Sequence, residues 1–214
     1  MKIAHFSDTH GLPRKPVPSD ADVIVLSGDI CPNKTRGHRH VERPYQTEWL
    51  RRTGADWKRW AGDKPLLLVE GNHDFVDPAP ILRESRVRAM NLEGREVEVF
   101  GMKFMGLPDI PWMGGEWNHE RQEDEIKRHI DLILERRPDV LVSHSPIYGV
   151  LDCPWGDYHI GSTALSNALV HGEHRPIAVL HGHCHEMGSQ TREVMGMLVS
   201  NAAMGRRVHV ISRR

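Results

Sequence analysis

The chain has 214 residues and carries 28 Lys and Arg against 29 Asp and Glu, so its formal net charge is −1. That length fits a single domain over residues 1–214, and 39% apolar with 27% charged residues is the balance of a folded globular protein. The balanced charge argues against a mainly electrostatic nucleic-acid binder. The 15 histidines outnumber Trp, Tyr and Phe together, which points to metal or proton chemistry.

No apolar run approaches the roughly 20 residues that a membrane helix needs, and Pro65–Val69 is among the longest. The start of the chain, Met1–Asp8, lacks the long apolar segment of a signal peptide. The three cysteines, Cys31, Cys153 and Cys184, are too few for a disulfide framework and favour a reducing compartment. We therefore expect a cytoplasmic protein without a membrane partner, and inert thiols, because no thiolate ligand set is evident near them.

Five short apolar runs each end at a polar cluster, and we expect each run to form a β-strand. In chain order they are Lys2–Phe6, Val23–Leu26, Leu66–Val69, Val140–Val142 and Ile177–Leu180. The carboxyl ends of strands in an α/β sheet are the usual place for ligands. The polar clusters that follow the runs are therefore candidates for a functional site.

Apolar residues recur at helical spacing in 49–60 and 126–134, and Ser162 can cap a third helix that extends to Val170. Segments 96–107 and 191–212 are expected to be rich in β-structure, with turns at glycines. The tryptophans at helical spacing are expected to pack in the core. The charged run 120–128 is most simply a solvated helix face.

The polar clusters contain the residue types of a metal site. In chain order they are Asp8-x-His10, Gly28-Asp29, Gly71-Asn72-His73-Asp74, His144 and Gly182-His183-x-His185. Carboxylate, imidazole and amide oxygen suit Mn, Fe, Zn and related divalent ions without a thiolate. Strand alternation points positions i and i+2 the same way, so each Asp-x-His or His-x-His pair can supply two ligands. The carboxylate of Asp29 can bridge two ions, and the neighbouring glycines permit close approach.

These five elements, in this order over residues 8–185, resemble the calcineurin-like metallophosphoesterase superfamily. The resemblance implies an α/β fold, a four-layer α/β/β/α sandwich of two mixed β-sheets flanked by helices, with a dinuclear metal site at the strand C-terminal ends. It implies two divalent metal ions, with Mn²⁺ the first expectation and Fe, Zn, Ni or Co as alternatives. The implied ligands are Asp8, His10, Asp29 and His185 for one ion, and Asp29, Asn72, His144 and His183 for the other.

The same resemblance implies a two-metal hydrolysis in which a metal-bridging hydroxide attacks phosphorus in line. His73 matches the family's histidine that protonates the leaving group, and Asp74 is expected to orient His73. General acid catalysis of this kind typically contributes about 10²–10⁴-fold.

A second resemblance, carried by residues 144–152, 182–186 and 200–202, is to the small single-domain branch that includes the MPPED-type brain proteins and bacterial cyclic-nucleotide phosphodiesterases. It implies hydrolysis of phosphodiester bonds in small or cyclic nucleotides. The long connections 31–44, 108–119 and 147–161 could supply substrate contacts by charge and by stacking. The candidate substrate-binding residues are Arg39, His40, Trp112, Trp117 and His159.

Two enzyme alternatives use the same dinuclear site, namely a phosphomonoesterase and a DNA or RNA nuclease. A scaffold cannot decide among them, because one fold serves many substrates. A nuclease needs a groove with several phosphate contacts, and the near-zero net charge favours a small phosphate ester over a long polyanion, so a nucleic-acid substrate is not favoured. A non-catalytic interaction protein would be expected to have lost ligands, and every expected ligand is present. The oligomeric state has no signal in the sequence.

Overall fold

The described part of the chain, residues 1–35 and 37–212 of a computed structural model, forms thirteen strands and four α-helices. The helices are α1 (Arg39–Ala61), α2 (Pro78–Glu84), α3 (Glu123–Glu135) and α4 (Thr163–His171), with a 3-10 turn η1 (His185–Met187). The first strands are β1 (Lys2–Ser7), β2 (Val23–Ser27), β3 (Leu66–Val69), β4 (Ala89–Asn91), β5 (Val97–Val99) and β6 (Met102–Leu107). The others are β7 (Ile110–Pro111), β8 (Glu120–Arg121), β9 (Val140–Ser143), β10 (Ala178–His181), β11 (Gln190–Val194), β12 (Met197–Asn201) and β13 (Gly205–Val210).

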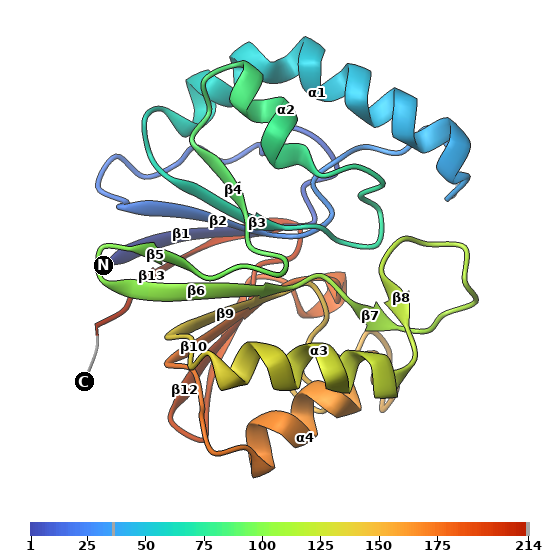
Figure 1. The fold of residues 1–214 in the computed structure, drawn as a ribbon, viewed down its shortest axis with the longest axis vertical. Helices are drawn as coiled ribbons and strands as arrows, with labels where there is room; N and C mark the ends of the chain where they lie inside the picture. Colours follow the sequence, from blue (N-terminus) through green and yellow to red (C-terminus); the bar gives the residue numbers. More distant parts are fainter. Residues whose placement is uncertain (36, 213–214) are drawn as a thin grey trace.

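Two β-sheets lie face to face at the centre, and helices cover the outer face of each (Figure 1). The first sheet has the order β13-β1-β2-β3-β4 and the second β11-β12-β10-β9-β6-β5. Both are mixed, because β13 is antiparallel to β1, and β5 and β11 are antiparallel to their neighbours. Helices α1 and α2 cover the first sheet, and α3 and α4 the second. The predicted four-layer sandwich of mixed sheets is confirmed.

The parallel strands of each sheet end level with one another. Phe6 of β1 lies opposite Leu26 of β2, which lies opposite Leu68 of β3. In the second sheet, Val142 of β9 lies opposite Leu180 of β10. Because the strands are parallel, the segments that follow them emerge at the same edge of each sheet. All five predicted strands are confirmed, and this register brings their polar ends together.

Three layers of buried side chains separate the four layers of secondary structure. The layer between the first sheet and its helices contains Leu26 and Trp57. The layer between the sheets contains Val25 and Phe104, and the layer under α3 and α4 contains Leu141. Adjacent Val25 and Leu26 thus face opposite sides of one sheet, as strand pleating requires. The central sheets are buried on both faces, which explains their continuous apolar runs.

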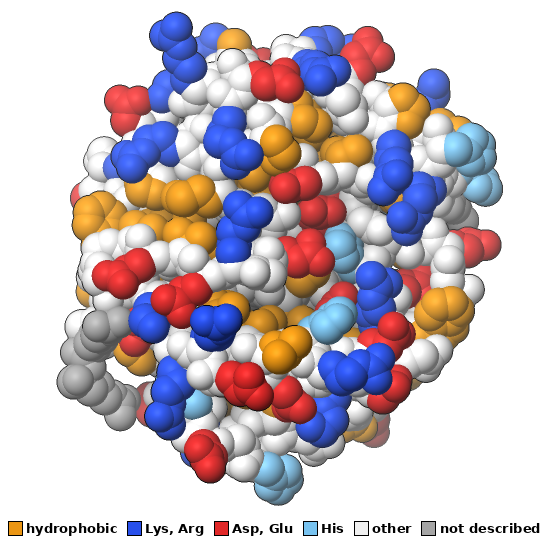
Figure 2. Space-filling model, in the orientation of Figure 1, with side chains coloured by type: hydrophobic (Ala, Val, Ile, Leu, Met, Phe, Trp, Pro, Cys, Tyr) orange, Lys and Arg blue, Asp and Glu red, His pale blue; other side chains and the backbone are white. Residues whose placement is uncertain are grey.

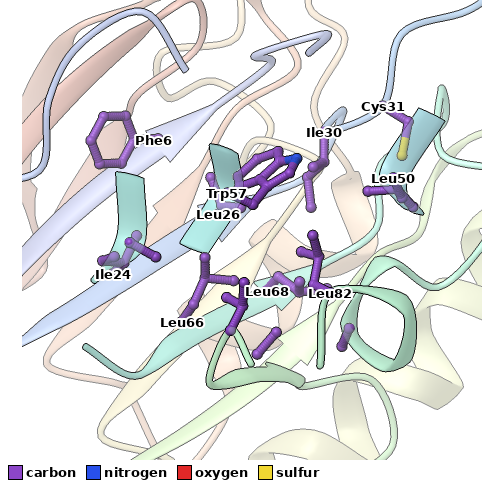
Figure 3. Close-up of a cluster of buried hydrophobic side chains, with 14 of the residues drawn as sticks. Phe6, Ile24, Leu26, Ile30, Cys31, Leu50, Trp57, Leu66, Leu68 and Leu82 are labelled. Atoms are coloured by element: carbon purple, nitrogen blue, oxygen red, sulfur yellow. The ribbon is translucent and has the colours of Figure 1, made fainter. Parts of the chain in front are cut away.

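Figure 3 shows the layer under α1, in which Trp57 lies among aliphatic side chains of the first sheet. Trp57 is fully buried, and its ring lies 6.3 Å from that of Trp49 and 5.5 Å from that of Trp60, edge to face in both cases. The predicted core role of these tryptophans is confirmed. Their spacing places all three on the face of α1 that packs on the sheet.

Helices α3 and α4 begin next to one another and share a cap. The Ser162 hydroxyl accepts a hydrogen bond from the Leu165 N–H at 3.1 Å, which confirms the predicted cap. Glu123, in the first turn of α3, accepts from the Ser162 hydroxyl and from the Ala164 N–H, both at 2.8 Å. These bonds satisfy N–H groups at the start of α4 and fix the two helices side by side.

Helix α1 begins earlier than the sequence suggested. The connection predicted over 31–44 ends at His38, α1 begins at Arg39, and Pro44 lies inside the helix. Proline removes a helical N–H donor, but tertiary contacts of the same turns hold the helix together. The buried Glu42 carboxylate accepts two backbone N–H groups of the preceding segment, at 2.9 and 2.6 Å. Arg39 and His40 therefore lie in the first turn of a helix and not in a loop.

The face of the molecule in Figure 2 carries basic and acidic side chains interspersed, in keeping with the net charge of −1. It presents no broad surface of a single sign of charge.

Among residues 1–35 and 37–212, no helix combines the length and the hydropathy needed to cross a bilayer.

We predict that Trp57→Ala lowers the free energy of unfolding by about 3–5 kcal/mol, because it leaves a cavity in a fully buried layer. Trp57→Phe should cost less, since the Trp57 Nε1 has no hydrogen-bond partner among the described residues. Urea unfolding followed by circular dichroism measures both. The matched control is Leu132→Ala on α3, whose side chain is 62% exposed and whose loss should cost less than about 0.5 kcal/mol. An equal cost for Trp57→Ala and Leu132→Ala would contradict the assigned core.

Candidate metal centre

The seven predicted metal ligands lie together where strands of both sheets end. The His185 Nε2 lies 3.0 Å from the Asp8 Oδ1. The His144 Nε2 lies 3.4 Å from the Asp29 Oδ1 and 3.0 Å from the Asn72 Oδ1. Segments far apart in the sequence, after β1, β2, β3, β9 and β10, thus place polar atoms within contact distance of one another.

The remaining two ligand candidates, His10 and His183, lie beside the other five. The His10 Nε2 lies 3.9 Å from the second Asp29 oxygen, Oδ2, and the His10 and His185 rings are 5.7 Å apart. The His183 ring lies 5.0 Å from that of His144. Asp29 therefore presents one oxygen to His144 and the other to His10. A carboxylate placed in this way can contact two ions, one on each side.

The chain turns sharply at the ligand positions. Asp8, His10, Asp29 and His183 have positive φ angles of 52°, 42°, 53° and 66°, a conformation that non-glycine residues rarely adopt. Strand alternation, from which paired ligands were expected, is therefore broken at these positions. The left-handed conformation directs the side chains toward the space between the strand ends. Such strain persists where the surrounding structure imposes it, and it is typical of functional sites.

Glycines beside the ligands leave room for this convergence. A Cβ atom on Gly71 would overlap the Asp29 carboxylate and backbone nitrogen, and one on Gly28 would overlap the His144 ring. A Cβ on Gly182 would overlap the Asp8 carboxylate. The glycines are needed here because another residue's side chain occupies the space that their own would fill.

Charge is concentrated in the buried part of the centre. Burial opposes the ionisation of Asp29, but the neighbouring His144 outweighs it and holds the pKa of this carboxyl well below its usual range. Burial also disfavours a charged His144, whereas Asp29 raises the His144 pKa to about 9. Burial and the nearby His144 together lower the pKa of His183 to about 3. The cluster thus holds ionised Asp29 and neutral His183, and His144 must lose its proton before its Nε2 can bind a cation.

Backbone contacts fix the orientation of His144. Its Nδ1–H donates to the Ser27 carbonyl oxygen at 2.8 Å, so Nε2 points toward Asp29 and Asn72. Such a bond to the second ring nitrogen is the usual way in which a ligating histidine is oriented. The residues present fit a pair of divalent cations, because nitrogen and oxygen donors converge on a carboxylate that faces two directions.

His73 lies at the edge of this group. Its Nε2 is 3.9 Å from the Asp29 Oδ2, and its Nδ1 is 2.5 Å from the Asn33 Oδ1. The Asn33 Nδ2 donates to the His73 carbonyl oxygen at 3.2 Å, so Asn33 holds both the ring and the backbone. The Trp117 ring lies 4.1 Å from the His73 ring and covers it. Sequence analysis did not identify Asn33, because an amide in a loop carries no distinctive signal.

Asp74 does not occupy the position that was expected for it. We predicted that it orients His73, but its carboxylate accepts hydrogen bonds from the backbone N–H groups of Ile30, Cys31 and Gly71, at 2.7–3.1 Å. Asn33, and not Asp74, contacts the His73 ring. Asp74 instead ties the segment after β2 to the segment after β3. Burial and the charge of Asp29 raise the Asp74 pKa to about 7.

The loop that carries Trp117 is held by Glu120. This carboxylate accepts hydrogen bonds from the N–H groups of Met113, Gly115 and Trp117, at 2.8, 2.7 and 2.9 Å. Glu120 is buried, Glu120–Arg121 form β8, and α3 begins only at Glu123, so the prediction that residues 120–128 form a solvated helix face is wrong for residues 120–122. The carboxylate satisfies backbone donors that the tight loop cannot pair internally.

The other candidate substrate residues lie at different distances from the centre. The Arg39 Nη2 donates to the Asn118 Oδ1 at 2.9 Å, and Asn118 in turn donates to the Asp74 carbonyl oxygen at 2.6 Å. Trp112 is 54% exposed and His40 is also exposed. His159 faces Asp152 and Cys153 and makes none of the contacts described for the metal ligands.

The fold and the donor set define a metal-dependent hydrolase. A model of the calcineurin-like phosphoesterase family matches residues 1–187, and the chain belongs to this family. Calcineurin-like phosphoesterases use divalent metal ions to hydrolyse phosphoester bonds. The described chain supplies the clusters of Asp and His residues that this chemistry requires.

Two further likenesses are more distant. The probable rhamnogalacturonate lyase C of Emericella nidulans is 26% identical over an alignment 214 positions long, which covers 91% of this chain and 18% of that protein. The chain therefore spans less than a fifth of that relative's length. A solved archaeal phosphodiesterase shares 14% identity and a TM-score of 0.42, over 94% of this chain and 82% of its own. Neither likeness assigns a substrate to this chain.

We predict that Gly71→Ala lowers the bound divalent metal and destabilises the protein by about 1–3 kcal/mol, because the new methyl group displaces Asp29. Metal content after dialysis against Mn²⁺, measured by plasma mass spectrometry, reports the first effect and urea unfolding the second. The control is Gly94→Ala, at φ +66° with no described atom within 4 Å of the added Cβ. It should cost about 1 kcal/mol and keep its metal. Full metal retention by Gly71→Ala would contradict the packing assigned to this glycine.

Proposed function

We propose that the protein is a metal-dependent phosphodiesterase acting on small diesters, with cyclic nucleotides as the favoured class. The observation that supports this most directly is the convergence of oxygen and nitrogen donors on Asp29, whose two oxygens face different imidazoles. When bound, two divalent ions lower the pKa of coordinated water and neutralise phosphate charge. Mn²⁺ is the favoured ion. The proposed ligands are Asp8, His10, Asp29 and His185 on one side, and Asp29, Asn72, His144 and His183 on the other.

The charge of the centre favours a monoanionic diester over a dianionic monoester. Within the described residues, the hydrogen bonds and ion pairs of the seven donors include no Lys or Arg. A dianionic monoester needs more positive charge than a monoanionic diester. In the described part of the chain, the seven ligand side chains and their partners add no Lys or Arg to the charge of the metal ions. A polynucleotide would need a row of cationic side chains to contact its phosphates. The face in Figure 2 instead carries basic and acidic side chains interspersed. Both alternatives remain outcomes of the substrate test below.

His73 is the proposed general acid. Because its Nδ1–H donates to the Asn33 Oδ1, its Nε2 is the nitrogen that faces Asp29 and the substrate position. A proton carried on Nε2 can pass to the oxygen that leaves phosphorus. Burial lowers the pKa of His73, so its protonated form is a stronger acid than an exposed imidazolium. Trp117 restricts the ring by covering one of its faces.

The rim residues are proposed to select the substrate. Trp117 and the exposed Trp112 lie in one loop, where an indole can stack on a nucleobase. Arg39 and His40 lie in the first turn of α1, and Arg39 reaches the same loop through Asn118. A guanidinium there can pair with a phosphate oxygen.

The substrate test is a panel assayed with Mn²⁺, containing bis-p-nitrophenyl phosphate, p-nitrophenyl phosphate, 2′,3′- and 3′,5′-cyclic nucleotides and single-stranded DNA. We expect a higher kcat/KM for the diester than for the monoester, measurable turnover of at least one cyclic nucleotide, and loss of activity after chelation. A preference for the monoester, or for DNA with a steep salt dependence of affinity, would overturn the proposed substrate class. Asp29→Ala, which removes the central carboxylate, should lose metal and activity together.

We predict that His73→Ala keeps its metal and loses about 10²–10⁴-fold in kcat on a cyclic nucleotide, whose leaving alkoxide needs a proton. The loss on bis-p-nitrophenyl phosphate should be smaller, because p-nitrophenolate leaves without protonation. Steady-state kinetics on both substrates measure the difference. His171→Ala, an exposed histidine at the end of α4, is the matched control and should behave as wild type. Equal losses on both substrates would argue against His73 as the acid.

A further inference from the structure

A second group of metal-binding side chains lies in the connection between β9 and α4. The Cys153 Sγ is 3.1 Å from the His159 Nδ1, which is 2.8 Å from the Asp152 Oδ1. The Sγ and the Asp152 Oδ1 are 3.8 Å apart. None of these residues belongs to the seven ligand candidates of the metal centre. The sequence showed no ligand set near the cysteines, whereas the Cys153 thiol lies beside an imidazole and a carboxylate, both of which are metal-ligand types.

We propose that Asp152, Cys153 and His159 bind one divalent cation, for which Zn²⁺ is the best chemical match, at a site separate from the metal centre. Thiolate, imidazole and carboxylate are the three side-chain ligand types of zinc sites. Hard ions such as Mg²⁺ and Mn²⁺ prefer oxygen, so the thiol selects against them. As the sulfur bonds to the ion, the Cys153 proton passes to solvent, and thiolate and carboxylate together balance two positive charges.

The spacing of the three ligand atoms suits a tetrahedral ion. Zinc bond lengths of about 2.3 Å to sulfur and 2.0–2.2 Å to nitrogen and oxygen imply separations of roughly 3.4–3.6 Å between ligand atoms. The observed 3.1, 2.8 and 3.8 Å differ from these by about 0.2–0.6 Å. The shortest separation is that of a hydrogen bond between His159 and Asp152, whose proton the ion would replace. Side-chain rotation is enough to reach the bound geometry.

One ligand is already fixed in place. Asp152 is fully buried, and its Oδ2 accepts hydrogen bonds from the N–H groups of Gly149 and Gly161, each at 3.1 Å. Its backbone carbonyl oxygen accepts from the Ile160 N–H at 3.1 Å. The two ends of the connection are thus fastened to Asp152, and Oδ1 is left to face Cys153 and His159. Supporting bonds of this kind orient ligands before an ion arrives.

A reversal of the chain brings the other two ligands together. Trp155 and Tyr158 form a β-bridge, with the Tyr158 N–H donating to the Trp155 carbonyl oxygen at 2.9 Å. Cys153 and His159 flank this turn. The His159 side chain is 27% exposed, so solvent reaches the group and can supply a fourth ligand. A site with three protein ligands and one open position exchanges its ion more readily than a closed four-ligand site.

The group is joined to the metal centre by one side chain. The Asn201 Nδ2 donates to the Leu151 carbonyl oxygen at 3.3 Å and to the Cys184 carbonyl oxygen at 2.8 Å. Leu151 precedes Asp152, and Cys184 lies between two ligand candidates of the centre.

Desolvation and the charge of Asp152 raise the pKa of the Cys153 thiol, so without an ion it is a thiol and a poor nucleophile.

The test is a Co²⁺ titration of the full-length, chelator-treated protein, followed by absorption spectroscopy. We expect a thiolate-to-Co²⁺ charge-transfer band in the near ultraviolet whose final intensity corresponds to one thiolate-bound ion per chain, reached by the time the two sites of the metal centre are also filled, and which excess Zn²⁺ abolishes. The metal centre contributes no such band, because its seven proposed ligands include no sulfur. The readout therefore does not depend on whether the protein hydrolyses phosphodiesters. Absence of the band in the wild-type protein overturns the proposal.

Three variants assign the band. Cys153→Ala should abolish it and lower the Zn²⁺ bound by one equivalent, and His159→Ala should weaken Co²⁺ binding at least tenfold. The matched control is Cys31→Ala, which removes a buried thiol elsewhere and should leave the band intact. Persistence of the band in Cys153→Ala, or unchanged affinity in His159→Ala, would overturn the assignment. Zn²⁺ should also protect Cys153 from alkylation by iodoacetamide, which peptide mass spectrometry measures directly.

Discussion

The buried carboxylate of Asp29 is the constraint on which the arrangement of the metal centre depends. It follows β2, in the middle of the parallel strands, and its oxygens face imidazoles that come from β1 and from β9. An ionised carboxylate that is 2% exposed requires positive charge close by. His144 supplies that charge in the protein alone, and cations would supply it in the loaded enzyme. The strands of the two sheets must therefore end at the same edge of the molecule, because the imidazoles that face the Asp29 carboxylate follow strands of both sheets.

This convergence is achieved at a local cost in backbone conformation. Four of the seven ligand candidates adopt positive φ, and Gly28 and Gly71 leave space that any Cβ would fill. Each left-handed non-glycine residue costs on the order of 1–3 kcal/mol. Three buried apolar layers offset such costs, since the central strands are covered on both faces. The strain is confined to the strand ends, where it directs donors inward, and the strands themselves remain regular.

The strands and the ligand candidates could be predicted from the sequence because each apolar run and its polar cluster are adjacent in the chain. The start of α1 and the role of Glu120 could not, because both depend on contacts between segments. Glu42 stabilises a helix that contains Pro44, and Glu120 binds three N–H groups of a preceding loop. The family resemblance implied that Asp74 orients His73. Asn33, forty residues away in the chain, contacts the His73 ring instead.

The metal ligands and the residues proposed to select the substrate differ in how they are held in place. The ligands follow buried strands, whose register is fixed by the core, so their positions tolerate little change. Trp117 covers His73 from a loop that depends on Glu120 alone for three of its backbone bonds. A loop held in this way can change sequence and shape without disturbing the strands. It nevertheless touches the proposed acid directly, so a change in the loop alters both the substrate that fits and the orientation of the group that protonates it.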